Sequence, residues 1–394
     1  MLNYSSSQND SLANSPLFSI DSTAASVIHK LFANRTNRSA YWRAHCFAIA
    51  VTFLPLLVLT FAMPNQGSAF AANSHRLTFA NDWNILFTYL LSFPCILGLA
   101  VTDQNVLASS LETVQLDGTL IVGKGAASLS DTWRKKFRNV NMFAQLLGTA
   151  IGFAVSYINY IIYRPVEVGY WIADDQGLLP IGYAYLCSIF LLYFVVTIYV
   201  LRNLAIALFL KDVVAMSELH LLPLHPDDSA GLYPIGRLGL RNQYVLMLLG
   251  INIVLVIGVT ITYLRPPPHL YELIAVAIAA YLVLGPLVFL APLLPFREGM
   301  LKTKVTLQSE VAQRIRVELQ NVRRKMKSGE ISKADEELID RLRKMAAVIR
   351  ELPVWPFNPA TLQKFLASYI IPAVGTAGFA VLKAATEFIK SHLL

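Results

Sequence analysis

IGYAYLCSIFLLYFVVTIYVL, the stretch Ile181–Leu201, decides the fold of this chain because it is almost entirely apolar and carries no charged side chain. A helix needs about 20 mostly apolar residues to cross roughly 30 Å of hydrocarbon. Five further stretches meet this requirement, namely Cys46–Met63, Ile85–Val101, Phe143–Tyr163, Tyr244–Leu264 and Leu273–Leu293. The sequence therefore predicts a bundle of six transmembrane helices.

The composition agrees with a membrane protein. Hydrophobic residues make up 55% of the 394 and charged residues 15%, whereas soluble domains hold about 25% charged residues. The formal net charge of +8 has two interpretations, basic inner loops and nucleic-acid binding, and the first is the simpler. Cys46, Cys95 and Cys187 lie in or beside apolar runs without metal-ligand spacing, so we expect them to act as small apolar side chains.

The lysines and arginines predict the orientation. Segments on one side of the six spans, the amino-terminal side, carry 13 of these residues, and segments on the other side carry three. The thirteen include Arg202 and Arg241, which this scheme places in the segment after the fourth span. Apolar positions that recur from Leu204 to Leu210 predict that the helix of the fourth span continues past Arg202, into the cytoplasm or along the interface. Because cytoplasmic loops hold the excess of positive charge, we expect a multi-pass protein of the cell inner membrane with a cytoplasmic amino terminus.

The predicted membrane interior holds almost no ionisable group, since His45, Asp103 and Glu272 fall at span edges. Coupled transporters and intramembrane hydrolases need titratable or coordinating groups at mid-depth, so both classes are disfavoured. A pore remains compatible, because small, polar or apolar side chains can line it. Asn159 and Asn252 are the polar groups at depth, with interhelical hydrogen bonding and pore lining as alternatives.

Two backbone patterns stand out inside the spans. Pro55, Pro94 and Pro286 each remove a backbone hydrogen bond and favour a kink, which has two interpretations, a gating hinge and static packing. Gly148 and Gly152 form a Gly-x-x-x-Gly pair, which suits close contact between helices.

A turn follows the fourth span at Pro223–Leu232, with the sequence PLHPDDSAGL. Its two prolines and its glycine are turn signals. His225, Asp227 and Asp228 are the candidate gating residues of this turn. A structural turn is the first interpretation and a ligand or metal site the second, although three residues this close seldom complete a metal shell.

Three motifs resemble a little-characterised group of bacterial polytopic membrane proteins. They are the turn at Pro223–Leu232, the Gly285-Pro286-Leu287 end of the sixth span, and Trp355-Pro356-Phe357. The resemblance covers the carboxyl-terminal half, and it differs where the group often has two adjacent glycines and this chain has Ala230 before Gly231. It implies no catalytic residue, and it suggests a membrane effector of an anti-phage defence system.

A heptad seam begins at Leu301 and has a spacing of 4-3. Its members are Leu301, Val305, Gln308, Ala312, Ile315, Leu319, Val322 and Met326. After Ser328-Gly329, Ser332 and Asp335 predict a capping box, and a second seam runs from Leu338 to Leu352. The pattern predicts an antiparallel helical hairpin about 45 Å long, whose seam suits packing within one chain or between subunits.

Six basic residues before the turn of this hairpin are the candidate ligand-binding residues. They are Arg314, Arg316, Arg323, Arg324, Lys325 and Lys327. Arg316, Arg323 and Lys327 fall on one helical face. The alternatives are a solvated face paired with nearby glutamates, contact with anionic lipid, and binding of an anionic nucleotide or oligonucleotide.

These patterns together predict an all-α membrane protein in four parts. They are a cytoplasmic amino-terminal segment (1–45), a six-span transmembrane domain (46–296), a cytoplasmic helical hairpin (297–354) and a membrane-associated carboxyl-terminal segment (355–394). No nucleophile arrangement, phosphate loop or carboxylate pair is visible, so we expect no enzyme and no cofactor. The predicted function is a homo-oligomeric channel or pore gated from the cytoplasm. The alternatives are a membrane scaffold that recruits a cytosolic partner protein and a facilitator of a small neutral solute.

Overall fold

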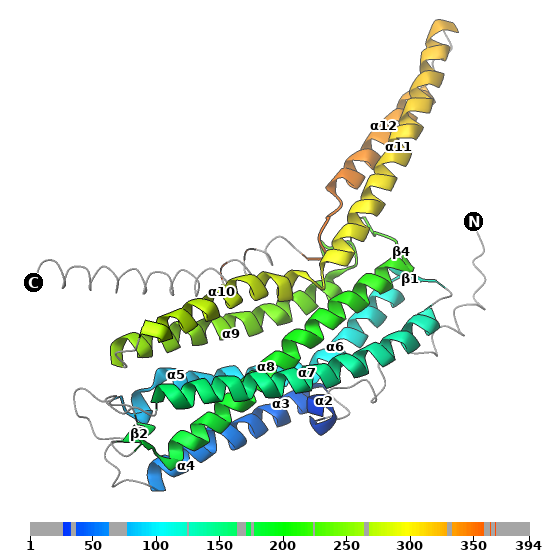
Figure 1. Ribbon diagram of the computed structural model, residues 1–394. Coiled ribbons are helices and arrows are strands. Elements are labelled where there is room, and N and C mark those ends of the chain that lie inside the picture. Colours follow the sequence, from blue (N-terminus) through cyan, green and yellow to red (C-terminus); the bar gives the residue numbers. More distant parts are fainter. Residues whose placement is uncertain are drawn as a thin grey trace, which may run out of the picture.

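The computed structural model describes residues 27–32, 37–62, 77–123, 126–163, 171–174, 177–223, 225–263, 268–328 and 333–357, with Gln363 and Ala367. This part of the chain is almost entirely helical, as predicted. Figure 1 shows long helices packed lengthwise in a bundle, from which two helices extend, α11 (Leu294–Ser328) and α12 (Lys333–Glu351). We call these two helices the arm.

Five helical stretches are long and apolar enough to cross a membrane. They are Arg38–Ala62, Trp83–Leu116, Ser128–Tyr163, Pro180–Ala215 and Tyr233–Val259. A sixth, Ile278–Leu290 followed by Leu294–Lys327, meets the same test only as a pair bent by 48°. The described helices therefore fit a multi-pass membrane protein with five or six spans.

The first two spans each contain one π-helical turn directly before a predicted hinge proline. The first span consists of α3 (Asn37–Ala48), the π turn η1 (Ile49–Phe53) and α4 (Leu54–Ala62), and α2 (Val27–Phe32) precedes it. The second consists of α5 (Trp83–Phe87), the π turn η3 (Thr88–Ser92) and α6 (Phe93–Leu116), after the short 3-10 helix η2 (Phe79–Asn81). Pro55 and Pro94 each lie two residues after such a turn. Because a proline has no N–H, it donates no hydrogen bond to the preceding turn, and the backbone there adopts the wider π geometry. The two π turns contact each other.

Helices α7 (Ala126–Tyr163) and α8 (Pro180–Ala215) form the longest helix pair of the bundle. Gly148 and Gly152 lie at their contact, where a Cβ would come within 3.1 Å of the Phe194 carbonyl oxygen and 2.8 Å of the Phe190 ring. The Gly-x-x-x-Gly pair therefore serves close packing within the chain. α7 also exposes a row of large apolar side chains, namely Met142, Phe143, Leu146, Phe153, Tyr157 and Ile161.

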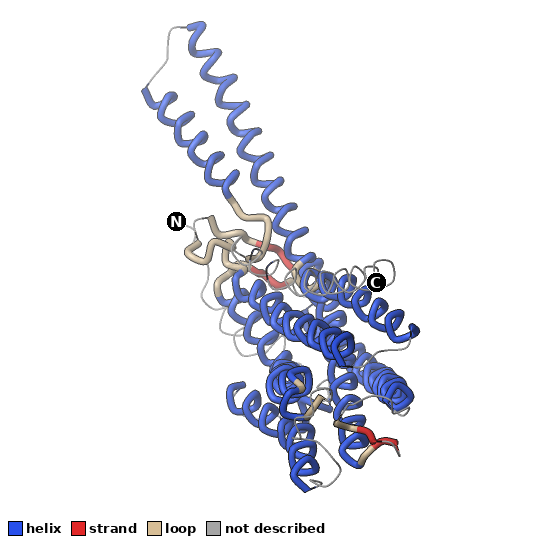
Figure 2. The backbone as a smooth tube through the Cα atoms, turned by 90° about the vertical axis from the view of Figure 1, so that its left-hand side faces the viewer, coloured by secondary structure: helices blue, strands red, loops and turns tan. Residues whose placement is uncertain are grey.

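Two small antiparallel strand pairs lie at opposite ends of the bundle. Strand β1 (Leu120–Val122) pairs with β4 (Ser217–Leu219), and β2 (Ala173–Asp174) pairs with β3 (Gly177–Leu178). Figures 1 and 2 agree that the arm leaves the bundle at the end of β1 and β4. We call this the arm end of the bundle.

Three segments that lie far apart in the sequence meet at the arm end. Leu232 from the turn, Phe289 from α10 (Pro268–Leu290) and Phe357 belong to one buried apolar cluster. The Phe289 and Phe357 rings lie 6.2 Å apart. In α9 (Tyr233–Tyr263), a Cβ at Gly236 would clash with the Pro356 carbonyl. The start of the predicted 355–394 segment therefore packs in this cluster, and the apolar run 365–382 within it lies almost wholly outside the described residues.

Within the arm, α11 and α12 run in opposite directions side by side, with α11 rotated relative to the predicted seam. The Lys304 ammonium donates to the carbonyls of Arg350 and Leu352, at 2.8 and 2.6 Å, and the Lys325 ammonium lies 2.7 Å from the Asp335 carboxylate. These contacts fix the rotation of α11, so that Val311, which is not a seam residue, is buried against α12. Part of the predicted seam remains exposed. Ser332 of the predicted capping box lies outside the described residues.

Candidate functional site

Arg202 is a completely buried arginine in α8, with a relative exposure of 2%. Its Nε donates to Asp103 Oδ2 of α6 at 2.6 Å, and its Nη2 donates to Gln104 Oε1 of the same helix at 3.2 Å. Its Nη1 donates to Asn141 Oδ1 of α7 at 3.1 Å. One guanidinium thus joins three helices, and we call these four residues the Arg202 cluster.

One sequence-based prediction is confirmed at this cluster and another is wrong. α8 continues past Leu201 to Ala215, as the apolar positions after the fourth span predict, so Arg202 lies within a helix and not in a loop. The predicted interior was expected to hold almost no ionisable group, with Asp103 at a span edge, but Asp103 forms a buried ion pair with Arg202 inside the bundle. Burial of such a pair is costly unless its other polar atoms are bonded, and an ionisable residue in a membrane bundle indicates a functional site by default.

A second arginine lies close to the cluster. Arg241, predicted to lie in the loop after the fourth span, belongs to α9 instead. Its Nη2 donates to the Leu99 carbonyl at 3.0 Å and to Thr102 Oγ1 at 2.7 Å, both on α6. Asp103, Arg202 and Arg241 together carry a formal charge of +1 among the packed helices.

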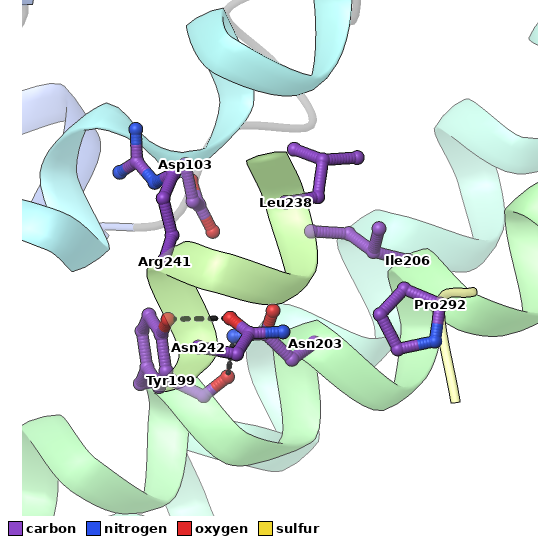
Figure 3. A pocket seen from close by; sticks show the side chains of 8 residues that line it. All are labelled: Asp103, Tyr199, Asn203, Ile206, Leu238, Arg241, Asn242 and Pro292. Carbon is purple, nitrogen blue, oxygen red and sulfur yellow. Dashed lines mark hydrogen bonds between the residues drawn. The ribbon is translucent and has the colours of Figure 1, made fainter. Parts of the chain in front are cut away.

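A cavity of about 20 Å³ lies beside Arg241 and Asp103 (Figure 3). Its lining residues come from α6, α8 and α9 and from the break after α10, and they are Asp103, Tyr199, Asn203, Ile206, Leu238, Arg241, Asn242 and Pro292. Asp103 Oδ1 is buried and has no hydrogen-bond partner among the described residues. A polar cavity of this size has room for one water molecule, which would satisfy that oxygen.

The cavity adjoins the point where the chain bends into the arm. α10 ends at Leu290 and α11 begins at Leu294 after a bend of 48°, with Pro292 between them. Because a proline has no N–H, the Val288 carbonyl four residues earlier loses its helical donor. The break therefore lies at Pro292, and α10 continues through Pro286, the predicted hinge.

Asn242 supplies the missing donor at this break. Its Nδ2 donates to the Val288 carbonyl at 2.9 Å, and its Oδ1 accepts from the Tyr199 hydroxyl at 2.6 Å. Asn242 is 3% exposed. This side chain, which comes from α9, therefore connects α8 to the break before the arm. We call Tyr199, Asn242, Val288 and Pro292 the joint.

The turn with the predicted gating residues is organised by Asp227. Its Oδ1 accepts from the backbone N–H groups of Ser229 and Gly231, at 2.9 and 3.1 Å, and its Oδ2 accepts from Tyr233 N at 3.1 Å. His225 Nδ1 lies 2.7 Å from Asp227 Oδ1. Tyr233 is the first residue of α9, so Asp227 also caps this helix. Asp228 is exposed and has a positive φ of 52°.

The electrostatics of this turn follow from these bonds. Burial alone would raise the pKa of the Asp227 carboxyl, but hydrogen bonds from Ser229, Gly231, His225 and Tyr233 outweigh burial and leave the pKa below its usual value. Within the described residues, no group of three His, Cys, Asp or Glu side chains could hold a metal ion. The described contacts are those of a structural turn, the first of the two interpretations.

The six basic residues of the arm fall into two groups. Arg314 pairs with Glu318 at 3.7 Å, and Lys325 pairs with Asp335. The other four make no ion pair with any described residue and are exposed, namely Arg316, Arg323, Arg324 and Lys327. Arg316 lies 24 residues beyond Pro292, about 36 Å along α11. The basic residues of α11 and the joint are therefore separate sites.

A second buried polar contact lies further from the arm. Asn252 Nδ2 donates to Ser92 Oγ at 2.8 Å, and Thr88 Oγ1 donates to Asn252 Oδ1 at 3.0 Å. This is the interhelical hydrogen bonding that was one alternative for Asn252. Asn159 differs, because its Nδ2 donates to the Val155 carbonyl of its own helix at 2.8 Å.

Comparison with known proteins found no matching family model, no similar curated protein and no similar solved structure. The resemblance to a bacterial membrane-protein group stays a prediction. A functional assignment must therefore start from the geometry of the joint and the arm.

Proposed function

We propose that this chain is a subunit of a channel or pore in the cell inner membrane, gated from the cytoplasm by its arm. The orientation rests on the basic residues. Removing Arg202 and Arg241, which bond within the bundle, from the thirteen leaves eleven against three, so the asymmetry persists. The arm and the amino terminus then face the cytoplasm.

The observation that carries the proposal is the double hydrogen bond of Asn242 at the joint. A change in the angle between α10 and the arm would strain or break the bond to the Val288 carbonyl. Asn242 would pass this strain to Tyr199 of α8, which lies beside the cavity lined by Asp103 and Arg241. Movement of the arm would thereby reach the centre of the bundle.

Conduction needs more space than the joint cavity offers. About 20 Å³ holds one water molecule, so an open state requires separation of helices at the joint or a pore between copies of the chain. The apolar row on α7, which includes Phe143 and Phe153, is exposed in the single chain and is available for contact with lipid or a second copy. We therefore propose a homo-oligomer.

The gating signal belongs to the same proposal. The cations Arg316, Arg323 and Lys327, which make no ion pair with any described residue, suit an anionic species in the cytoplasm as the gating signal. In anti-phage defence, infection would supply that signal and membrane depolarisation would be the response. Depolarisation of infected cells that carry the wild-type gene, and not of cells that carry the Asn242→Leu variant, is the expected result.

The decisive experiment is current recording from purified protein in planar bilayers, with and without cytosolic extract. We expect the wild type to conduct and Asn242→Leu to change the open probability, because Leu cannot donate to the Val288 carbonyl. Asn159→Leu is the matched control, since the bond that Asn159 makes among the described residues lies within its own helix. Absence of current from folded wild-type protein under both conditions would refute the channel.

A membrane scaffold is the second candidate, favoured by the exposed apolar side chains of α11, such as Val305 and Met326. A scaffold would recruit a cytosolic partner without passing current. Partner recruitment by the wild type and by Asn242→Leu alike, with no current from either, would favour this function over the channel.

A further inference from the structure

An unpartnered apolar row runs along the arm. Leu301, Val305, Leu319 and Met326 are 45, 55, 47 and 64% exposed. Single exposed apolar residues are ordinary, but these recur at heptad spacing, together with the smaller Ala312, over 26 residues, or about 39 Å of helix. We call these five residues the α11 row.

The α11 row is exposed because α12 packs against a neighbouring side of α11. Leu307, Val311 and Ile315 pack in the arm core, and Lys304 and Lys325 hold α11 in this rotation through their bonds to α12. Turning the row towards α12 would break these bonds and expose the buried Val311. Among the described residues, nothing covers the row.

The charges beside the row are asymmetric. With Val305, Leu319 and Met326 at heptad position a, Arg316 and Arg323 fall at position e, directly beside the row. Both make no ion pair with any described residue. On the opposite edge, the g positions include Val311, which is buried against α12, and Lys325, which pairs with Asp335. A helix that lies on the row would thus meet an apolar strip with cations along one edge only.

This asymmetry identifies the occupant. In an antiparallel pair of two copies, Arg316 and Arg323 would face the same cations, and in a parallel pair they would face a g edge that α12 already occupies. Nucleic acid would use the cations and leave the apolar strip in water. A helix with an apolar stripe and acidic flanking residues satisfies both features.

We propose that the α11 row binds an acidic amphipathic helix of a partner protein, which adds a third helix to the arm. The pairing uses heptad contacts for affinity and the cations Arg316 and Arg323 for partner choice. Binding of a partner helix to the α11 row does not depend on conduction. The experiment below therefore tests it independently of the channel proposal.

The test uses a synthetic, fluorescent peptide of about four heptads, with Leu at a and d and Glu at e and g, and the full-length protein in detergent. Binding is measured by fluorescence anisotropy. We expect Val305→Glu with Leu319→Glu to weaken binding at least tenfold. Arg316→Glu with Arg323→Glu should weaken it about tenfold at low salt, with a smaller loss at high salt, because salt screens exposed charges.

Two controls match these variants. Arg341→Glu with Lys344→Glu makes the same change of charge on exposed positions of α12 and should leave peptide binding unchanged. A peptide with Lys in place of Glu should bind at least tenfold more weakly. Thermal melting checks that each variant is folded, which we expect because Val305 and Leu319 are already about half exposed.

Three outcomes would overturn the proposal. The first is equal binding of the Glu and Lys peptides. The second is tight binding of a single-stranded oligonucleotide or of anionic vesicles that needs Arg316 and Arg323, without any peptide binding. The third is a disulfide between two chains through Leu319→Cys in vesicles, because a second copy would then occupy the row.

Discussion

The arginines of the joint region and those of the arm have opposite environments. Arg202 is buried, and its guanidinium donates to Asp103, Gln104 and Asn141 of two other helices. Arg316 and Arg323 are exposed on α11 and make no ion pair with any described residue. The same side chain therefore ties helices together where water is excluded and remains available for a partner where water is present. Burial, rather than residue type, separates the structural cations of this chain from its candidate recognition cations.

The largest expected effect is loss of a buried charge. Arg202→Met should destabilise the protein by about 3–5 kcal/mol, because it leaves the Asp103 carboxylate buried without its cation. Arg316→Met should change stability by less than about 0.5 kcal/mol. Denaturant unfolding in detergent measures both. If Arg202→Met with Asp103→Leu is no more stable than Arg202→Met alone, the uncompensated charge is not the cause.

The next effect tests the contact between α9 and the segment after α12. Gly236→Ala should cost about 1–3 kcal/mol, because the added Cβ would clash with the Pro356 carbonyl. Gly258→Ala in the same helix is the control, since no atom lies within 4 Å of a Cβ there. We expect the control to be neutral or slightly stabilising. Equal melting temperatures for the two variants would contradict this packing.

A smaller effect concerns the turn. The folded pKa of Asp227 is lowered, so its stabilisation is present above the unfolded value of about 3.8 and is lost as the pH falls through the folded pKa. Asp227→Asn should cost about 0.5–1.5 kcal/mol near neutral pH, because both carboxylate oxygens accept backbone N–H bonds and an amide keeps only one acceptor oxygen. This difference should shrink below about pH 4. Melting curves from pH 3 to 7 test this, and a gap that is constant over the range would contradict it.

Sequence patterns predicted the long apolar helices and the two helices of the arm, because long apolar runs and heptad repeats are typical of such helices. They did not predict the rotation of α11, which leaves part of the expected seam exposed. They also did not predict the Arg202 cluster. The apolar positions that recur from Leu204 to Leu210 predicted that the helix continues past Leu201, but no sequence pattern pairs Arg202 with Asp103, Gln104 and Asn141 of other helices.

The joint was beyond sequence reasoning for a different reason. The sequence suggests hinges at Pro55, Pro94 and Pro286. The break lies instead at Pro292, at the end of the predicted sixth span. Its role depends on Asn242, which is 50 residues away in sequence and donates to the carbonyl that Pro292 leaves unbonded. Such a pairing becomes visible only when α9 and α10 are seen packed together.

Locking the arm to the bundle tests the central claim most directly. Thr303 Oγ1 of α11 donates to the Leu219 carbonyl at 3.3 Å, and the Leu219 side chain faces α11 near Gly299. Thr303→Cys with Leu219→Cys, in a chain with Cys46, Cys95 and Cys187 replaced by alanine, should form a disulfide that stops the arm from moving. In planar bilayers, we predict that the response of the current to cytosolic extract disappears on oxidation and returns on reduction. An unchanged response while the disulfide is fully formed would contradict gating through the arm.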